Sequence, residues 1–121
     1  MANTFKVVTF AAEPASAGTP YVMYTVATST TTVVLGLVLS NINTTAVTAE
    51  VELVSTTSAR GGTNNVANGT SFLIKDVNIP TGSSLEILSG GKVVLEAGDK
   101  IQVDCSVADK LSGTLSIMEI T

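Results

Sequence analysis

The feature that most constrains this chain is a hydrophobic period of two residues, which recurs in separate short segments. In residues 47–53 every second side chain is apolar, and the side chains between them are Thr48, Glu50 and Glu52. Residues 100–107 alternate in the same way. Successive side chains of a β-strand point to opposite faces of a sheet. The period therefore predicts strands with one face in a core and the other face half exposed.

The composition favours strands along the whole chain. Valine, threonine and isoleucine are β-branched and supply 41 of the 121 residues, and no segment shows a helical period. Nine segments have strand character: 4–10, 21–26, 33–42, 47–53, 72–79, 84–88, 92–95, 100–107 and 113–120. Turn residues separate them, as is typical of sandwiches and barrels. We predict an all-β protein, a single antiparallel β-sandwich of about eight strands, jelly-roll-like or Ig-like.

The longest apolar run extends from Val33 to Leu39, with Gly36 inside it. A membrane-spanning helix needs about 20 apolar residues, so we expect no membrane partner. A continuous apolar run is typical of a strand that is covered on both faces. We expect residues 33–42 to form a central strand of that kind.

The length of 121 residues fits one domain. Within it we expect an N-terminal strand or arm over residues 1–20 and a β-sandwich over residues 21–121. Pro14, Pro20 and the small residues around them oppose regular pairing, so the first strand should end at Phe10. The segment before Pro20 should serve attachment, as an arm that becomes ordered against a partner. Pro14 and Pro20 are therefore candidate contact residues.

The residue types that are missing exclude many functions. The chain has no histidine and no tryptophan, which excludes histidine-based catalytic triads and histidine-ligated zinc. A net charge of −4 with one arginine argues against a nucleic acid partner. Cys105 is the only cysteine, so no disulfide forms within the chain, and no secretory signal pattern is evident. We expect synthesis in the cytoplasm.

The remaining candidates for chemistry have simpler explanations. Cys105 alternates in register with Ile101, Val103 and Val107, which predicts a buried core thiol rather than a nucleophile. The carboxylates Asp99, Asp104 and Asp109 lack the spacing of a calcium loop, and we expect carboxylates of this chain to lie in solvent. Glu50 and Glu52 share one strand face and are expected to be solvated rather than an acid/base pair. We predict no enzyme, and no catalytic, cofactor or metal site.

A loop between Ser55 and Ser71 holds the best contact candidates. It is rich in glycine and asparagine, which permit close backbone approach and hydrogen bonding without burial of charge. Arginine is favoured at protein contacts because its rigid fork binds carboxylates. The predicted protein-contact residues here are Arg60, Gly61, Gly62, Asn64 and Asn65.

Five segments from Tyr21 onward form a familiar series, and they are Tyr24–Val26, Val33–Leu37, Phe72–Pro80, Gly82–Glu86 and Gly91–Ile101. In these segments the sequence resembles small β-rich virion structural proteins of tailed bacteriophages, including those of cyanophages. The resemblance implies a non-enzymatic protein of the virion, assembled in the host cytoplasm. The resemblance covers both capsid decoration (cement) proteins and small tail or neck components. Of these we expect a capsid decoration protein on the capsid surface that binds the lattice of the major capsid protein or other virion proteins.

Two other functions stay open at this stage. One is a small tail, neck or baseplate component, and the other is a carbohydrate-binding or receptor-binding β-sandwich module. Sugar rings usually need exposed aromatic side chains, and the chain has only five aromatics. Accessory proteins of the kind it resembles commonly form trimers, and the run from Val33 to Leu39 offers apolar surface for association. We expect a homotrimer.

Overall fold

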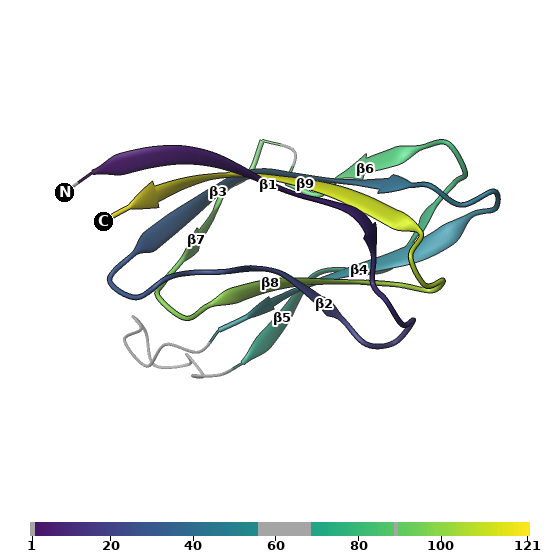
Figure 1. The fold of residues 1–121 in the computed structure, drawn as a ribbon, viewed down its shortest axis with the longest axis horizontal. Coiled ribbons are helices and arrows are strands. Elements are labelled where there is room, and N and C mark those ends of the chain that lie inside the picture. Colours follow the sequence, from purple (N-terminus) through teal and green to yellow (C-terminus); the bar gives the residue numbers. More distant parts are fainter. Residues whose placement is uncertain (1, 56–68, 89) are drawn as a thin grey trace.

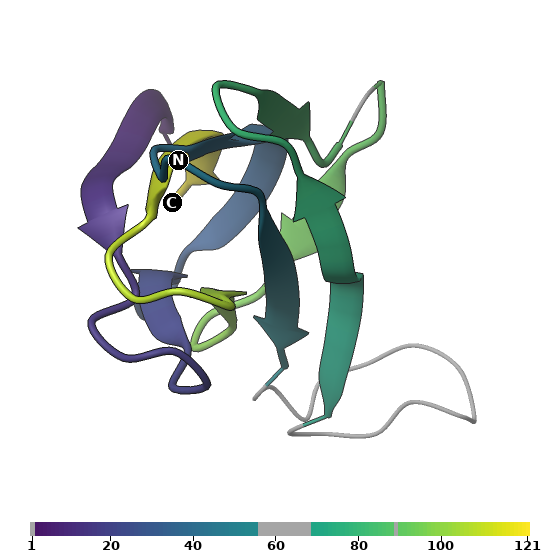
Figure 2. The ribbon, with the colours of Figure 1, turned by 90° about the vertical axis from the view of Figure 1, so that its right-hand side faces the viewer.

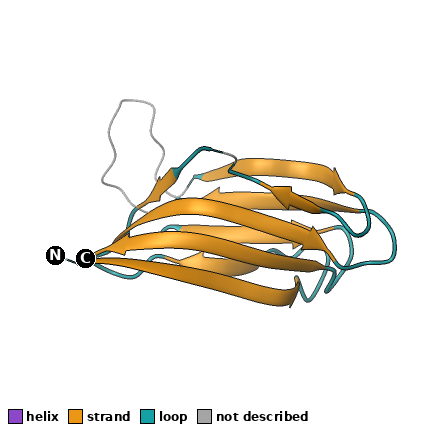
Figure 3. Ribbon diagram, turned by 90° about the horizontal axis from the view of Figure 1, so that it is seen from above, coloured by secondary structure: helices purple, strands orange, loops and turns teal. Residues whose placement is uncertain are grey.

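The computed structural model describes residues 2–55, 69–88 and 90–121. These residues form strands, turns and loops without a helix (Figures 1 and 3). The strands are β1 (Asn3–Glu13), β2 (Tyr21–Thr25), β3 (Thr31–Asn41), β4 (Val47–Val54), β5 (Thr70–Ile79), β6 (Ser84–Glu86), β7 (Val93–Leu95), β8 (Lys100–Cys105) and β9 (Leu111–Ile120). The prediction of an all-β protein is confirmed.

Two antiparallel sheets pack face to face, which confirms the predicted sandwich (Figures 1 and 2). The five-stranded sheet has the order β1-β9-β3, and β3 then pairs with β6 along one part and with β7 along another. The four-stranded sheet has the order β2-β8-β4-β5. The two ends of the chain lie side by side, because the backbones of Ala2 and Thr121 exchange two hydrogen bonds.

The core lies between the sheets and follows the two-residue period. In β8, Ile101, Val103 and Cys105 are buried and the residues between them are half-buried. From the other sheet, Leu115 and Ile117 of β9 face them. The prediction that Cys105 is a core thiol is confirmed. Val107 does not belong to this series, because β8 ends at Cys105 and Val107 is 37% exposed.

β3 is central in its sheet, as predicted, but it is not covered on both faces. Its pairing with β9 shifts register between Val34 and Gly36, which makes Leu35 an extra residue in a β-bulge. Leu35 and Val38 are each 36% exposed on the outer face, while Leu37 between them is fully buried. The apolar run is continuous because apolar side chains also occupy outer positions. The second sheet covers only the inner face.

The N-terminal residues form a longer strand than the sequence predicts. β1 continues past Phe10 to Glu13 and pairs with β9 as the edge of the five-stranded sheet. Phe10 is buried and its ring contacts that of Tyr21 edge-on, with centroids 5.3 Å apart. Of the two expectations for residues 1–20, a strand or an arm, residues 3–13 form a strand.

Candidate interaction surfaces

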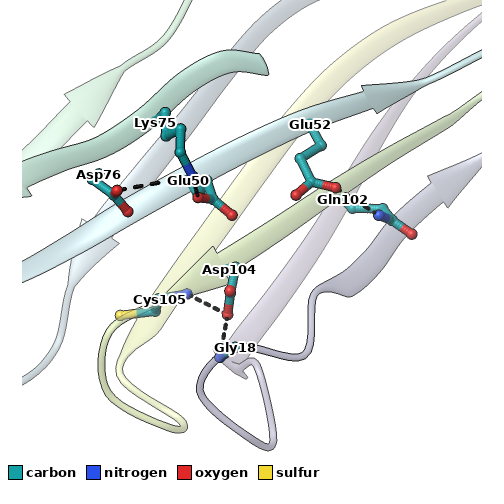
Figure 4. Close-up of polar contacts among 8 residues, drawn as sticks. All are labelled: Gly18, Glu50, Glu52, Lys75, Asp76, Gln102, Asp104 and Cys105. Carbon is teal, nitrogen blue, oxygen red and sulfur yellow. Dashed lines mark hydrogen bonds and ion pairs between the residues drawn. The ribbon is translucent and has the colours of Figure 1, made fainter. Parts of the chain in front are cut away.

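The outer face of the four-stranded sheet carries charged side chains from β4, β5 and β8 (Figure 4). Lys75 Nζ lies 2.7 Å from Glu50 Oε1, and Gln102 Nε2 donates a hydrogen bond of 3.0 Å to Glu52 Oε2. The hydrogen bond with Glu50 raises the pKa of Lys75. Glu50 and Glu52 therefore have separate hydrogen-bonding partners. They are half-buried rather than fully solvated.

A cleft of about 220 Å³ opens beside this charged face. Its lining residues are Ala17, Gly18, Thr48, Glu50, Asp76, Asp104, Cys105 and Ser106. Asp104 Oδ1 accepts hydrogen bonds from the backbone N–H groups of Gly18, at 3.1 Å, and of Cys105, at 2.9 Å (Figure 4). This carboxylate ties the segment after β1 to the end of β8. Both contacts of this oxygen are to backbone N–H groups of the same chain, so they stabilise the fold.

The cleft contains the Cys105 thiol and three carboxylates, those of Glu50, Asp76 and Asp104. Burial raises the pKa of the Cys105 thiol, which lowers the fraction present as the nucleophilic thiolate. In residues 2–55, 69–88 and 90–121, no group of three or more His, Cys, Asp or Glu side chains has a metal-binding arrangement. The charged face thus presents acidic side chains and hydrogen-bonding groups.

Asp99 corrects the expectation that the carboxylates lie in solvent. It is 2% exposed, in the turn between β7 and β8. Its Oδ2 accepts a hydrogen bond of 3.0 Å from the backbone N–H of Glu96, and the Asp99 N–H donates to the Glu96 carbonyl at 3.0 Å. The side chain stabilises this turn. A buried carboxylate with backbone partners is needed for the fold rather than for contact with a partner.

The outer face of the five-stranded sheet is different, because an apolar row crosses it. Phe5 pairs with Met118, Met118 with Val33, and Val33 with Val94, so four apolar side chains stand side by side across β1, β9, β3 and β7. Phe5 is 72% exposed and Val94 is 60% exposed. Val7 lies next to Phe5 on the same face and is 63% exposed. We call these five side chains the apolar row.

The rows beside the apolar row hold mainly hydroxyl and small side chains. Ser116 and Gly36 pair in the row of Val7, and Thr9, Thr114 and Val38 pair in the next row. Val38 also pairs with Glu86, which is the one charged side chain that the cross-strand pairs place in these rows. This face can therefore dock against a partner with little loss of charge solvation.

None of the contact residues predicted from the sequence belongs to the apolar row. Arg60, Gly61, Gly62, Asn64 and Asn65 lie outside the described residues. Pro14 is buried, and its carbonyl accepts a hydrogen bond of 2.8 Å from the Asp109 N–H. Pro20 is half-buried. The signal for the apolar row was present in residues 4–10, where both faces of the strand carry apolar side chains.

Comparisons with known proteins assign no family. No protein-family model matches the chain, and no curated protein matches it either. A solved structure described as "Bacillus endospore appendages form a novel family of disulfide-linked pili" is similar over 99% of this chain and 87% of that one, with 16% identity and a TM-score of 0.47. That similarity is too low to transfer any property. Within the part of the chain that is described, no helix is long and apolar enough to cross a membrane.

Proposed function

We propose that this protein is a non-enzymatic structural protein of a virus particle, a capsid decoration protein that binds the lattice of the major capsid protein. The observation that carries the proposal is the apolar row on the outer face of the five-stranded sheet. Phe5, Val7 and Val94 are each at least 60% exposed on that face. Adjacent exposed apolar side chains of this kind mark an interaction surface.

The energetics favour this face over the charged one. Full burial of a valine or phenylalanine side chain is worth about 1.5–3 kcal/mol, so docking of the apolar row supplies several kcal/mol. The other sheet would bring Glu50, Glu52 and Asp104 into the interface, and each carboxylate would lose hydration. The most favourable free energy of binding is therefore expected for a partner that covers the apolar row and leaves the acidic face in water.

Lattice binding also suits a domain of this size. A chain of 121 residues has an expected stability of about 5–15 kcal/mol, and a partner that binds only the folded form adds to it by mass action. Many equivalent contacts on a capsid would provide this stabilisation for every copy. The resemblance to virion proteins is consistent with that role.

A sugar-binding module is less well supported. Of the exposed large apolar side chains, the aromatic ones are Phe5 and Phe72. The ring of Phe72 has Lys75 Nζ over it, 4.7 Å from the centroid, so an ammonium group already occupies one face of this ring. Phe5 is part of the apolar row, where its neighbours are Met118 and Val7 rather than the hydrogen-bonding groups that orient a sugar.

The test is binding to the particles of the source. Purified protein is mixed with capsids stripped of accessory proteins, bound protein is measured by cosedimentation, and its position is found by electron microscopy. We expect saturable binding at regular capsid positions, weakened about tenfold by Val94→Thr combined with Met118→Thr. Glu52→Gln on the opposite sheet is the matched control and should bind as wild type.

Three results would overturn the proposal. They are the absence of binding to capsids, labelling restricted to a tail or neck, and equal binding by the double threonine variant and wild type. The two threonines keep a high strand propensity, so circular dichroism should show the wild-type fold for both variants.

A further inference from the structure

The four edges of the two sheets differ in how they prevent pairing with another strand. β6 and β7 are three residues each, which is too short to template a partner. β2 has five residues and a register shift between Val22 and Tyr24. β5 has two irregularities in its pairing, and Asp76 adopts φ 52°. Bulges and short length are the usual protections of an edge.

β1 lacks these protections over Asn3 to Phe10, because its one register shift with β9 lies beyond that stretch, between Phe10 and Glu13. It has eleven residues, and from Asn3 to Phe10 it pairs with β9 without a register shift. Every residue from Asn3 to Val7 is exposed. Its one cation, Lys6, lies 2.6 Å from Glu119 of the same chain, so the charge of Lys6 is paired within the chain. A long, regular edge without an unpaired charge can template another strand.

The direction of the backbone groups in β1 follows from the pairing of the chain ends. Ala2 and Thr121 exchange two hydrogen bonds, at 3.1 and 3.0 Å, and so form a hydrogen-bonded pair. Such pairs alternate with non-hydrogen-bonded pairs in an antiparallel ladder. In this unbroken register the even-numbered residues bond to β9. The N–H and C=O groups of Phe5, Val7 and Thr9 therefore point away from the sheet.

We propose that β1 pairs antiparallel with β1 of a second copy of this chain, which makes one continuous sheet across a two-fold axis. With Val7 opposite Val7 of the partner subunit, the outward groups of Phe5, Val7 and Thr9 all find partners. Each copy's Lys6 then lies opposite Val8, so no like charges face each other. The acidic outer face of the four-stranded sheet stays away from the axis.

A second copy fits this edge better than another kind of partner because the strand is complementary to itself. In this register Phe5 lies opposite Thr9, and Val7 opposite Val7, on the outer face. Aromatic and β-branched pairs of this kind stabilise sheets. The apolar row of each copy would also continue into that of the other. The inference does not rest on the proposed function, because it concerns the edge of the sheet and is tested without any particle.

The experiment measures association of the pure, full-length protein. Light scattering and sedimentation over a range of concentrations should show a monomer–dimer equilibrium. Val7→Pro removes an outward N–H that β1 does not give to β9, and proline is tolerated on such an edge. We expect it to weaken dimerisation about tenfold or more, since two symmetric hydrogen bonds are lost. Val7→Thr keeps the N–H group and should dimerise as wild type.

Two further measurements keep the inference testable if Val7→Pro does not fold. Amide exchange followed by NMR should show that Phe5, Val7 and Thr9 become protected as concentration rises. Val7→Cys should form an intersubunit disulfide on mild oxidation, since residues opposite each other across a hydrogen-bonded pair lie about 5.5 Å apart. Asn3→Cys, which has no symmetric partner in this register, should not.

The inferred dimer replaces the homotrimer that we expected from the sequence, so a trimer, or a monomer at all concentrations, would overturn the inference. It would also be overturned by a dimer in which these three amides exchange freely, or by a dimer that Val7→Pro leaves unchanged.

Discussion

A methyl group at Gly113 should destabilise the protein because the ring of Phe10 occupies the space. Gly113 of β9 lies directly opposite Phe10 of β1, and both residues are buried. A Cβ added at Gly113 would lie 2.6 Å from Phe10 Cζ and closer still to Cε2. The ring also packs edge-on against Tyr21, with the ring centroids 5.3 Å apart. Gly113→Ala must therefore displace either the ring or the strand.

The expected loss in the free energy of unfolding is about 1–3 kcal/mol, the usual result of adding atoms to a packed core. This is a sizeable part of a total stability of about 5–15 kcal/mol. Urea unfolding followed by circular dichroism measures the loss as a lower midpoint at an unchanged slope. The matched control is Gly36→Ala in β3, where a Cβ would meet no atom within 4 Å and the loss should stay below about 0.5 kcal/mol.

A double-mutant cycle identifies the cause. Phe10→Ala alone should remove about 3–5 kcal/mol, because it leaves a cavity. Adding Gly113→Ala to Phe10→Ala should then lower stability by much less than it does in the wild type. The ring of Phe10 does not limit the space at Gly113 if Gly113→Ala is as stable as Gly36→Ala. The same conclusion follows if Gly113→Ala lowers stability equally in the wild type and in Phe10→Ala.

Three further predictions concern polar and titratable groups. Burial, and then the hydrogen bond to Glu119, raise the pKa of Tyr24 to about 12, so the contribution of this residue to stability should be constant below pH 10 and be lost from pH 10 towards 12. Tyr24→Phe should reduce the alkaline loss of stability in urea titrations. The hydrogen bond from Lys6, and then the one from Tyr24, lower the pKa of Glu119. The contribution of Glu119 to the free energy of unfolding should therefore be present above pH 4.5 and be lost on acidification. Glu119→Gln should reduce this loss of stability in acid. Asp99→Ala should lower the free energy of unfolding by about 1–3 kcal/mol, because the N–H of Glu96 loses its buried acceptor; a stability equal to wild type would contradict the structural role of Asp99.

Local patterns in the sequence determine much of this fold. The alternation in residues 47–53 and 100–107 is a property of neighbouring residues, so it predicted both strands, their buried faces and the burial of Cys105. Proline and glycine marked the turns for the same reason, since their backbone preferences act locally. The all-β class followed from these short-range signals.

Only the tertiary structure decided which surfaces remain free. The sequence around Phe5 and Val7 places apolar side chains on both faces of the strand, a pattern that is equally compatible with a strand covered on both faces. Exposure of that face depends on two long-range features. One is the position of β1 at the edge of its sheet, and the other is the packing of the second sheet against the opposite face. The same applies to Val33 and Leu35, whose outer positions depend on a bulge against β9.

The sequence also did not predict the burial of Asp99 or the contact between Phe10 and Gly113. Asp99 sits in a turn where a solvated carboxylate is the ordinary expectation, and only the packing of the turn against the core buries it. Phe10 and Gly113 are about a hundred positions apart along the chain, so no local pattern connects them. Local backbone preference thus determined where strands form, whereas strand order and register determined which side chains meet and which face water.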